Sequence, residues 1–201
     1  MLMRYPARQL SRHNRQGFSL LEMMMVVAVV GILAAVSMPS FSRWIQDAKT
    51  RSTAEALQNG IRLAQVEALK NGAPVQFFLT NSTNPALNSV PSANGKNWGI
   101  QVLSTTVPNF AVTFVQGASL GAPNSDGVVM STTNPAIIFN SIGRLVSFNG
   151  AGQLIGAPRA IYSLSNSNLT NARQLNVTVS SSGSVRMCDP SKVRASNADG
   201  C

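Results

Sequence analysis

One carboxylate, Glu22, stands inside the longest apolar run of the chain, which extends from Phe18 to Met38. A charged side chain near the centre of a bilayer costs about 2.5–3.5 kcal/mol, so a glutamate in such a run normally has a partner or a role. The chemistry open to such a carboxylate is pairing with an opposite charge. Because Glu22 lies near the start of the run, the alternative is an incidental carboxylate that reaches the membrane interface.

The two cysteines, Cys188 and Cys201, both lie at the C-terminal end of the chain. Their separation matches no common metal motif, and the only histidine, His13, lies far upstream, so we expect no metal site. In an exported domain this pair predicts one disulfide that closes the tail, with a loop-entropy contribution of about 3 kcal/mol. The alternative is two free thiols, which an oxidising compartment disfavours.

Catalytic groups are sparse in the rest of the chain. No histidine follows His13, no pair of carboxylates accompanies a cleft signature, and no phosphate-binding glycine-rich loop precedes a helix. Serines and lysines are present but isolated, so a Ser–Lys dyad is the one arrangement that stays open. We predict that the protein is not an enzyme and has no cofactor.

Basic residues precede the apolar run and recur near the C-terminus. Lysine and arginine number 16 against seven acids, and four arginines precede Gly17, so the remainder has 12 against seven and a net charge of +5. Near the C-terminus Arg186, Lys192 and Arg194 could follow a phosphate backbone, although no aromatic residue is interleaved for base stacking. The alternative is a solvated basic loop.

The elements that position these residues begin with the apolar run. Its 21 residues reach about 30 Å as a helix, the thickness of a bilayer's hydrocarbon core. Positive charges before it, and no acid, place the N-terminus in the cytoplasm and export the C-terminal part. A cleaved secretory signal is the alternative, but it would need a shorter core and a small-x-small cleavage site. The basic residues of this leader are Arg4, Arg8, Arg12, His13 and Arg15.

Helical spacing continues after Pro39, so we expect one helix of about 80 Å from Phe18 to Lys70, kinked but not ended by Pro39. Gly72 and Pro74 then stop it. The second half is amphipathic and should pack on its own globular domain. The predicted core-facing stripe consists of Ile45, Ala48, Leu57, Ile61, Ala64 and Ala68.

From Ala73 the pattern changes toward a period of two, which predicts strands. Loops are expected over 81–97 and 117–134, and hairpin turns at 140–143 and 181–183. The predicted class is α+β: a long N-terminal helix packed on a C-terminal antiparallel β-sheet domain. The predicted strands are Val75–Thr80, Trp98–Leu103, Phe110–Gln116, Ala136–Asn140, Arg144–Phe148, Ala160–Leu164, Leu175–Ser180 and Ser184–Cys188.

The run Gly17-Phe18-Ser19-Leu20-Leu21-Glu22, after a basic leader and before an apolar stretch, resembles the class III signal of type IV prepilins and type II secretion pseudopilins. The resemblance implies that a prepilin peptidase cuts between Gly17 and Phe18 and methylates the new N-terminus. It also implies that Glu22, fifth in the mature chain, pairs with the N-terminal ammonium of a neighbouring subunit during assembly.

Three further features resemble the FimT/GspH family of minor pilins and pseudopilins: the segment 52–75, the pair Trp98-Gly99, and the turn Phe139-Asn140-Ser141-Ile142-Gly143-Arg144. The family implies a low-copy subunit near a filament tip, and some members bind DNA through a Gly-Arg-x-Arg motif. The matching positions here read Gly183-Ser184-Val185-Arg186, so serine replaces the first arginine.

These observations predict four segments: a leader (1–17), a transmembrane and assembly helix (18–39), its amphipathic continuation (40–71) and a periplasmic β-rich domain with a disulfide-closed tail (72–201). The expected location is the inner membrane, with incorporation into a pilus or pseudopilus. The first hypothesis for function is a minor pilin of a type IV pilus, and the second is a pseudopilin of a type II secretion system. The third is a DNA receptor for uptake. Expected partners are other pilins or pseudopilins, the prepilin peptidase, the inner membrane and DNA.

Overall fold

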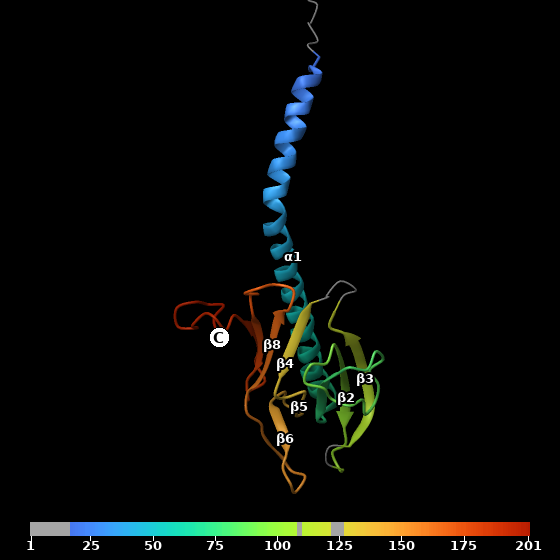
Figure 1. The fold of residues 1–201 in the computed structure, drawn as a ribbon. Coiled ribbons are helices and arrows are strands. Elements are labelled where there is room, and N and C mark those ends of the chain that lie inside the picture. Colours follow the sequence, from blue (N-terminus) through green and yellow to red (C-terminus); the bar gives the residue numbers. More distant parts are fainter. Residues whose placement is uncertain (1–16, 108–109, 122–126) are drawn as a thin grey trace, which may run out of the picture. The chain divides into compact units, whose positions relative to one another are not determined.

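A computed structural model describes residues 17–107, 110–121 and 127–201 of the chain (Figure 1). The leader residues Arg4, Arg8, Arg12, His13 and Arg15 lie outside this part. The chain divides into two compact units, with the boundary between Phe41 and Ser42.

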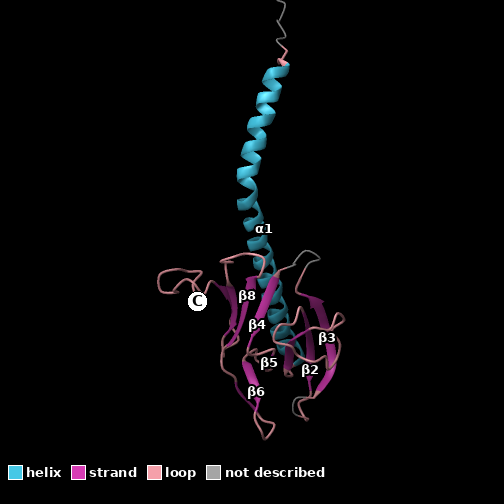
Figure 2. Cartoon of the chain, in the orientation of Figure 1, coloured by secondary structure: helices cyan, strands magenta, loops and turns pink. Residues whose placement is uncertain are grey.

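Helix α1 (Leu20–Asn71) is one continuous α-helix of 52 residues, and it includes Pro39 in its backbone (Figure 2). It begins two residues later than predicted, because Ser19 caps it: the Ser19 hydroxyl accepts from the backbone N–H of Glu22 at 3.1 Å. It ends at Asn71, where Gly72 takes the left-handed conformation (φ 59°) that commonly terminates helices.

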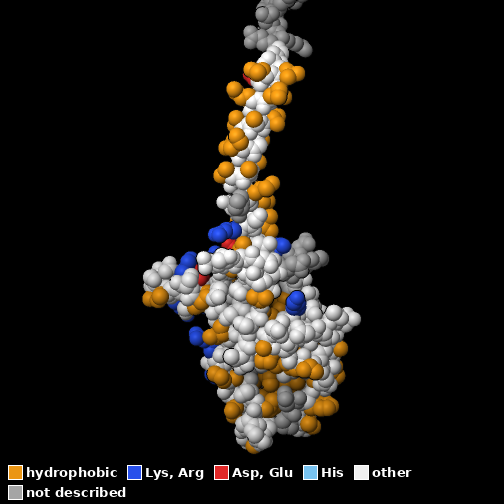
Figure 3. Space-filling view, viewed as in Figure 1, with side chains coloured by type: hydrophobic (Ala, Val, Ile, Leu, Met, Phe, Trp, Pro, Cys, Tyr) orange, Lys and Arg blue, Asp and Glu red, His pale blue; other side chains and the backbone are white. Residues whose placement is uncertain are grey.

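The first unit contains the N-terminal part of α1. Its large apolar side chains are exposed, and they crowd the surface of this segment in Figure 3. The most apolar window of 18 residues has a mean hydropathy of 2.4, and none of it is buried. The helix is therefore long and apolar enough to cross a membrane.

The second unit packs the rest of α1 on antiparallel strands. Two sheets form, one of six strands and one of four, and every strand pairing in them is antiparallel. The first sheet has the order β3 (Ala111–Ser119), β2 (Asn97–Leu103), β1 (Val75–Thr80), β5 (Ala136–Phe139), β6 (Leu145–Phe148), β7 (Leu154–Gly156). The second has the order β10 (Val185–Cys188), β9 (Leu175–Val179), β8 (Ala160–Asn166), β4 (Val128–Thr132). The predicted α+β class is confirmed.

Two strands were missed by the sequence interpretation. The predicted loop over 117–134 is wrong, because β3 runs to Ser119 and β4 occupies Val128–Thr132. Strand β4 pairs with β8, more than 25 residues downstream, so a non-local partner stabilises it rather than its own weak pattern. Strand β7 was not predicted at all, since it has only three residues, all exposed.

The core of the second unit lies between α1 and the sheets. The helix contributes small residues and leucine or isoleucine at helical spacing: Ala54, Leu57, Ile61, Ala64 and Ala68 are fully buried. Opposite them, Phe77 stacks on Trp98 with ring centroids 5.8 Å apart and meets Tyr162 edge-on at 6.4 Å.

The N-terminal end of the predicted core stripe was placed wrongly. Ala48 is exposed and Ile45 is only half-buried. The reason is that sheet strands cover α1 fully only from about Thr50 onward, whereas the helical pattern alone cannot show where the partner sheet begins.

Candidate functional site

The predicted processing site lies just before the first helical residue. Gly17 and Phe18 have no regular secondary structure and are exposed. Apart from its chain neighbours, no residue in the described part of the chain lies within 4 Å of the position of a β-carbon on Gly17. A peptide bond outside a helix requires no unwinding before it is cut. This geometry is compatible with cleavage between Gly17 and Phe18, which stays a prediction.

Glu22 lies in the first turn of α1, where a carboxylate interacts favourably with the helix dipole. Ser19 and Glu22 have the spacing of a capping box, a serine at the cap and a glutamate three residues later. The backbone half of that arrangement is present, since the Glu22 N–H donates to the Ser19 hydroxyl. The side chain of Glu22 is exposed, and so are the large apolar side chains that surround it on this part of the helix.

The tail is closed by the predicted disulfide between Cys188 and Cys201, whose Cα atoms are 5.1 Å apart. Asp189, directly after Cys188, is only 3 % exposed, and its backbone groups are hydrogen-bonded to the other end of the loop. Its backbone N–H donates to the Asp199 carbonyl at 2.7 Å, and its own carbonyl accepts from the Cys201 N–H at 3.2 Å.

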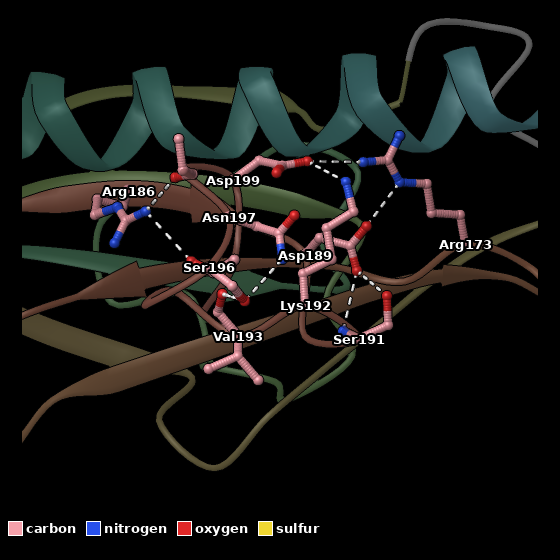
Figure 4. A network of polar contacts seen from close by, with 11 residues as sticks. Arg173, Arg186, Asp189, Ser191, Lys192, Val193, Ser196, Asn197 and Asp199 are labelled. Atoms are coloured by element: carbon pink, nitrogen blue, oxygen red, sulfur yellow. Dashed lines mark hydrogen bonds and ion pairs between the residues drawn. The ribbon is translucent and has the colours of Figure 1, made fainter.

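The side chain of Asp189 is held by two neighbours (Figure 4). Ser191 donates to it through its hydroxyl at 2.6 Å and its backbone N–H at 3.0 Å, and Arg173 donates through Nε at 3.0 Å. Burial would raise the pKa of Asp189, but the hydrogen bonds from Ser191 and Arg173 outweigh it and lower the pKa below its ordinary value.

A second carboxylate, Asp199, joins the same network from the far end of the loop. The Lys192 ammonium lies 2.6 Å from its Oδ2, and Arg173 approaches it at 3.6 Å. The hydrogen bond from Lys192, which outweighs desolvation, lowers the pKa of Asp199. Arg173 therefore contacts both acids of the tail. The sequence did not indicate this role, because Arg173 precedes β9 and its partners lie 16 or more residues further along the chain.

The three cations predicted to bind DNA all belong to this end of the molecule, but they differ in what they contact. The Arg186 guanidinium donates to the carbonyls of Ala198 at 3.2 Å and Gly200 at 3.4 Å, so it holds the loop against β10. The Lys192 ammonium donates a hydrogen bond to the Asp199 carboxylate. Arg194 is exposed and takes part in none of the ion pairs among the described residues.

A polar contact between α1 and both sheets was also missed. Gln65 on α1 donates through Nε2 to the Gly143 carbonyl at 2.8 Å and to the Gly183 carbonyl at 3.1 Å. Gly143 ends the β5–β6 turn and Gly183 ends the β9–β10 turn, both with positive φ (74° and 90°). The two predicted turns are therefore present, and a single helix side chain joins them.

Comparisons with known proteins agree with this architecture. Residues 12–38 match the model of the prokaryotic N-terminal methylation motif, and residues 53–183 match that of the type II transport protein GspH. The fold and the N-terminal motif define a pilin-like protein, a class that includes pilins and pseudopilins. The chain belongs to the GspH family, whose model covers more than half of its length.

Individual relatives come from pili. The chain is 36% identical over 99 residues to the type IV major pilin protein PilE1 of Neisseria gonorrhoeae, covering 49% of this chain and 42% of that protein. It is 33% identical over 105 residues to a fimbrial protein of Neisseria meningitidis, covering 52% and 57%. The chain thus spans about half the length of these relatives.

Among solved structures, the type IV minor pilin FimU of Pseudomonas aeruginosa matches with a TM-score of 0.52 at 14% identity. The match covers 72% of this chain and 92% of FimU. At this identity the likeness concerns the fold.

Proposed function

We propose that this protein is a minor pilin of a type IV pilus, processed between Gly17 and Phe18, methylated at Phe18 and assembled through α1. The observation that carries the proposal is the apolar, unburied first part of α1 with one carboxylate in its first turn. Such a segment needs lipid or like helices around it, since its own unit supplies no core. Pilins and pseudopilins assemble with one another, and the methylation motif implies the peptidase.

In this proposal the helix first anchors the protein in the inner membrane, with the β domain on the periplasmic side. The segments follow the predicted limits: a leader over 1–17, an assembly helix over 18–39, its amphipathic continuation over 40–71 and the β domain over 72–201. During assembly Glu22 pairs with the N-terminal ammonium of a neighbour. A buried charge that loses its partner is strongly destabilising, so this pair would select the correct axial register.

The test is the composition of sheared filaments from cells that produce Glu22→Ala. We expect cleavage to remain largely intact while the variant is lost from filaments. Glu55→Ala is the matched control, because Glu55 lies on the exposed surface of the same helix beside Arg51 and should leave incorporation unchanged. Normal incorporation of Glu22→Ala would contradict the assembly role.

Mass spectrometry of the endogenous protein tests the processing. The expected mass is that of a chain starting at N-methylated Phe18 and lacking the two thiol hydrogens of the disulfide. A chain that retains the leader would exclude both the cleavage site and the pilin role.

The second candidate is a pseudopilin of a type II secretion system, which is favoured by the match to the type II transport protein GspH. Both candidates use the same helix in the same way. Recovery with a purified secretion machine, combined with absence from sheared pili, would favour the pseudopilin.

A further inference from the structure

Several asparagines of the chain directly precede a glycine. In such a pair the backbone nitrogen of the glycine can attack the side-chain carbonyl carbon of the asparagine, because glycine has no β-carbon to hinder the approach. The reaction requires that the glycine nitrogen is free and that the carboxamide lies close to it. The pairs are Asn59-Gly60, Asn71-Gly72, Asn94-Gly95 and Asn149-Gly150.

Hydrogen bonds oppose this reaction in three of the pairs. Gly60 lies inside α1, where its backbone N–H belongs to the helical ladder. Gly95 is buried, and its N–H donates to the Ser92 carbonyl at 3.1 Å. Asn71 ends α1, and its Nδ2 donates to the Glu67 carbonyl at 2.8 Å, so its carboxamide lies back along the helix. Attack in these pairs therefore requires local unfolding first.

The fourth pair begins the turn between β6 and β7, which lies at one end of the second unit (Figure 1). Gly150 is exposed, and its N–H takes part in none of the hydrogen bonds found among the described residues. A β-carbon on Gly150 would meet nothing within 4 Å in the described part of the chain apart from its chain neighbours. The nitrogen that would attack is therefore free.

The carboxamide of Asn149 is held over the same turn. Its Oδ1 accepts from the backbone N–H groups of Ala151 at 3.0 Å and Gln153 at 2.8 Å. Its Nδ2 donates to Oε1 of Gln153 at 3.2 Å. Two N–H groups that converge on a carbonyl oxygen also stabilise the negative charge that this oxygen acquires when a nucleophile adds to its carbon. The turn thus positions the carboxamide and favours attack on it.

We propose that Asn149 is a site of spontaneous deamidation and isoaspartate formation in the folded protein. The Gly150 nitrogen forms a bond to Cγ of Asn149, the Cγ–Nδ2 bond breaks, and the proton of the glycine N–H leaves with Nδ2 as ammonia. The product is a five-membered succinimide. Water then opens the ring: cleavage of the bond to Cγ gives aspartate, and cleavage of the bond to the backbone carbonyl carbon gives isoaspartate.

The modification would change the edge of the first sheet. Isoaspartate adds one carbon to the main chain of the turn and introduces a negative charge. In the unmodified turn the Asn149 N–H donates to the Gln153 carbonyl at 2.9 Å, and the Asn149 carbonyl accepts from the Gly152 N–H at 2.9 Å. Strand β7 has three exposed residues and pairs with β6 at the end of its sheet, so loss of the turn should loosen β7. A long-lived subunit would accumulate this change.

Peptide mapping by mass spectrometry tests the proposal on the full chain, incubated in detergent at mildly alkaline pH. Deamidation replaces NH₂ by OH and so raises the mass of the peptide, and isoaspartate is detected by enzymatic methylation with an isoaspartyl methyltransferase. In the folded chain we expect Asn149 to react about tenfold faster than Asn59, Asn71 or Asn94. In guanidinium chloride the four rates should approach one another, because every glycine nitrogen is then free.

Gly150→Ala should slow the reaction at Asn149 about tenfold, because the new β-carbon hinders the approach of the nitrogen. Gly156→Ala is the matched control, since a β-carbon there also meets open space among the described residues, and it should leave the rate unchanged. The proposal is wrong if Asn149 of the folded wild type reacts no faster than Asn94. It is also wrong if Gly150→Ala reacts as fast as the wild type.

Discussion

Gly183 lies so close to Gly143 that a β-carbon on Gly183 would overlap the carbonyl oxygen of Gly143. The two residues belong to turns of different sheets, and Gln65 of α1 donates to both carbonyls. The backbone N–H of Leu145 also donates to the Ser181 carbonyl at 3.2 Å. Where the helix meets both sheets, the two turns therefore approach each other through their backbones. A side chain on Gly183 would prevent this close approach.

Gly183→Ala should destabilise the protein by about 2–4 kcal/mol, because it adds steric overlap with Gly143 to a left-handed backbone (φ 90°). The measurement is thermal unfolding in detergent by circular dichroism. Gly150→Ala is the control, since a β-carbon on Gly150 would point into open space among the described residues, and the substitution should change stability by less than about 0.5 kcal/mol. Equal unfolding temperatures for the two variants would contradict the tight junction.

Gln65→Ala should cost about 1–2 kcal/mol, because it leaves two turn carbonyls without their donor. Asn59→Ala, an exposed position on the same helix, should be neutral or slightly stabilising, since alanine has the higher helix propensity. Denaturant titration of both variants measures the difference. A neutral Gln65→Ala would mean that the turns hold each other without the helix.

Asp189 should make the tail sensitive to acid. Its pKa is lowered in the folded protein, so its contribution to stability is present above the ordinary pKa of about 3.9 and is lost as the pH falls through the lower folded value. The difference in unfolding temperature between wild type and Asp189→Asn should therefore shrink below about pH 4.

Asn59→Ala is the control for that acid titration, because it changes an exposed, uncharged side chain of α1 and removes no titratable group. Its difference from wild type should stay nearly flat over the same range. A constant difference for Asp189→Asn would show that the Arg173 and Ser191 contacts do not stabilise the charged form.

Tyr162→Phe should leave stability unchanged or raise it by about 1 kcal/mol. The Tyr162 hydroxyl is buried and has no hydrogen-bond partner in the described part of the chain, so removing it relieves a desolvation cost. Burial also raises the pKa of Tyr162, so its phenol should ionise only when alkali unfolds the protein. Ultraviolet titration of the processed chain measures this directly, because the other tyrosine, Tyr5, lies in the leader.

Two substitutions separate the predicted binding of DNA by these cations from their contribution to stability. Arg194→Ala should weaken DNA binding and lower the salt slope by about 1 without affecting stability, because Arg194 forms no ion pair in the described region. Arg186→Ala should lower stability as well, since it removes the bonds to Ala198 and Gly200. Gel-shift titrations at several salt concentrations test both, and no binding at low salt would exclude the DNA role.

Much of the architecture followed from local patterns. The helix, the β1 limits, both turns and the Cys188–Cys201 pair were predicted from periodicity, turn residues and spacing. The helix, the strand limits and the turns depend on neighbours within a few residues. The disulfide could be predicted because the chain has only two cysteines. Strand β4 was missed because its stability comes from pairing with β8, and Ala48 was misplaced because the helix extends beyond its sheet.

What the sequence by itself determined is the kind of molecule: an apolar helix with one acid near its start, followed by a β-rich domain with a closed tail. Only the tertiary structure decided which groups meet, such as Arg173 with Asp189, and Gln65 with Gly143 and Gly183. The physical reason is that hydrophobic periodicity specifies which face of an element is buried, whereas the pairing of distant polar groups depends on how those elements pack in three dimensions.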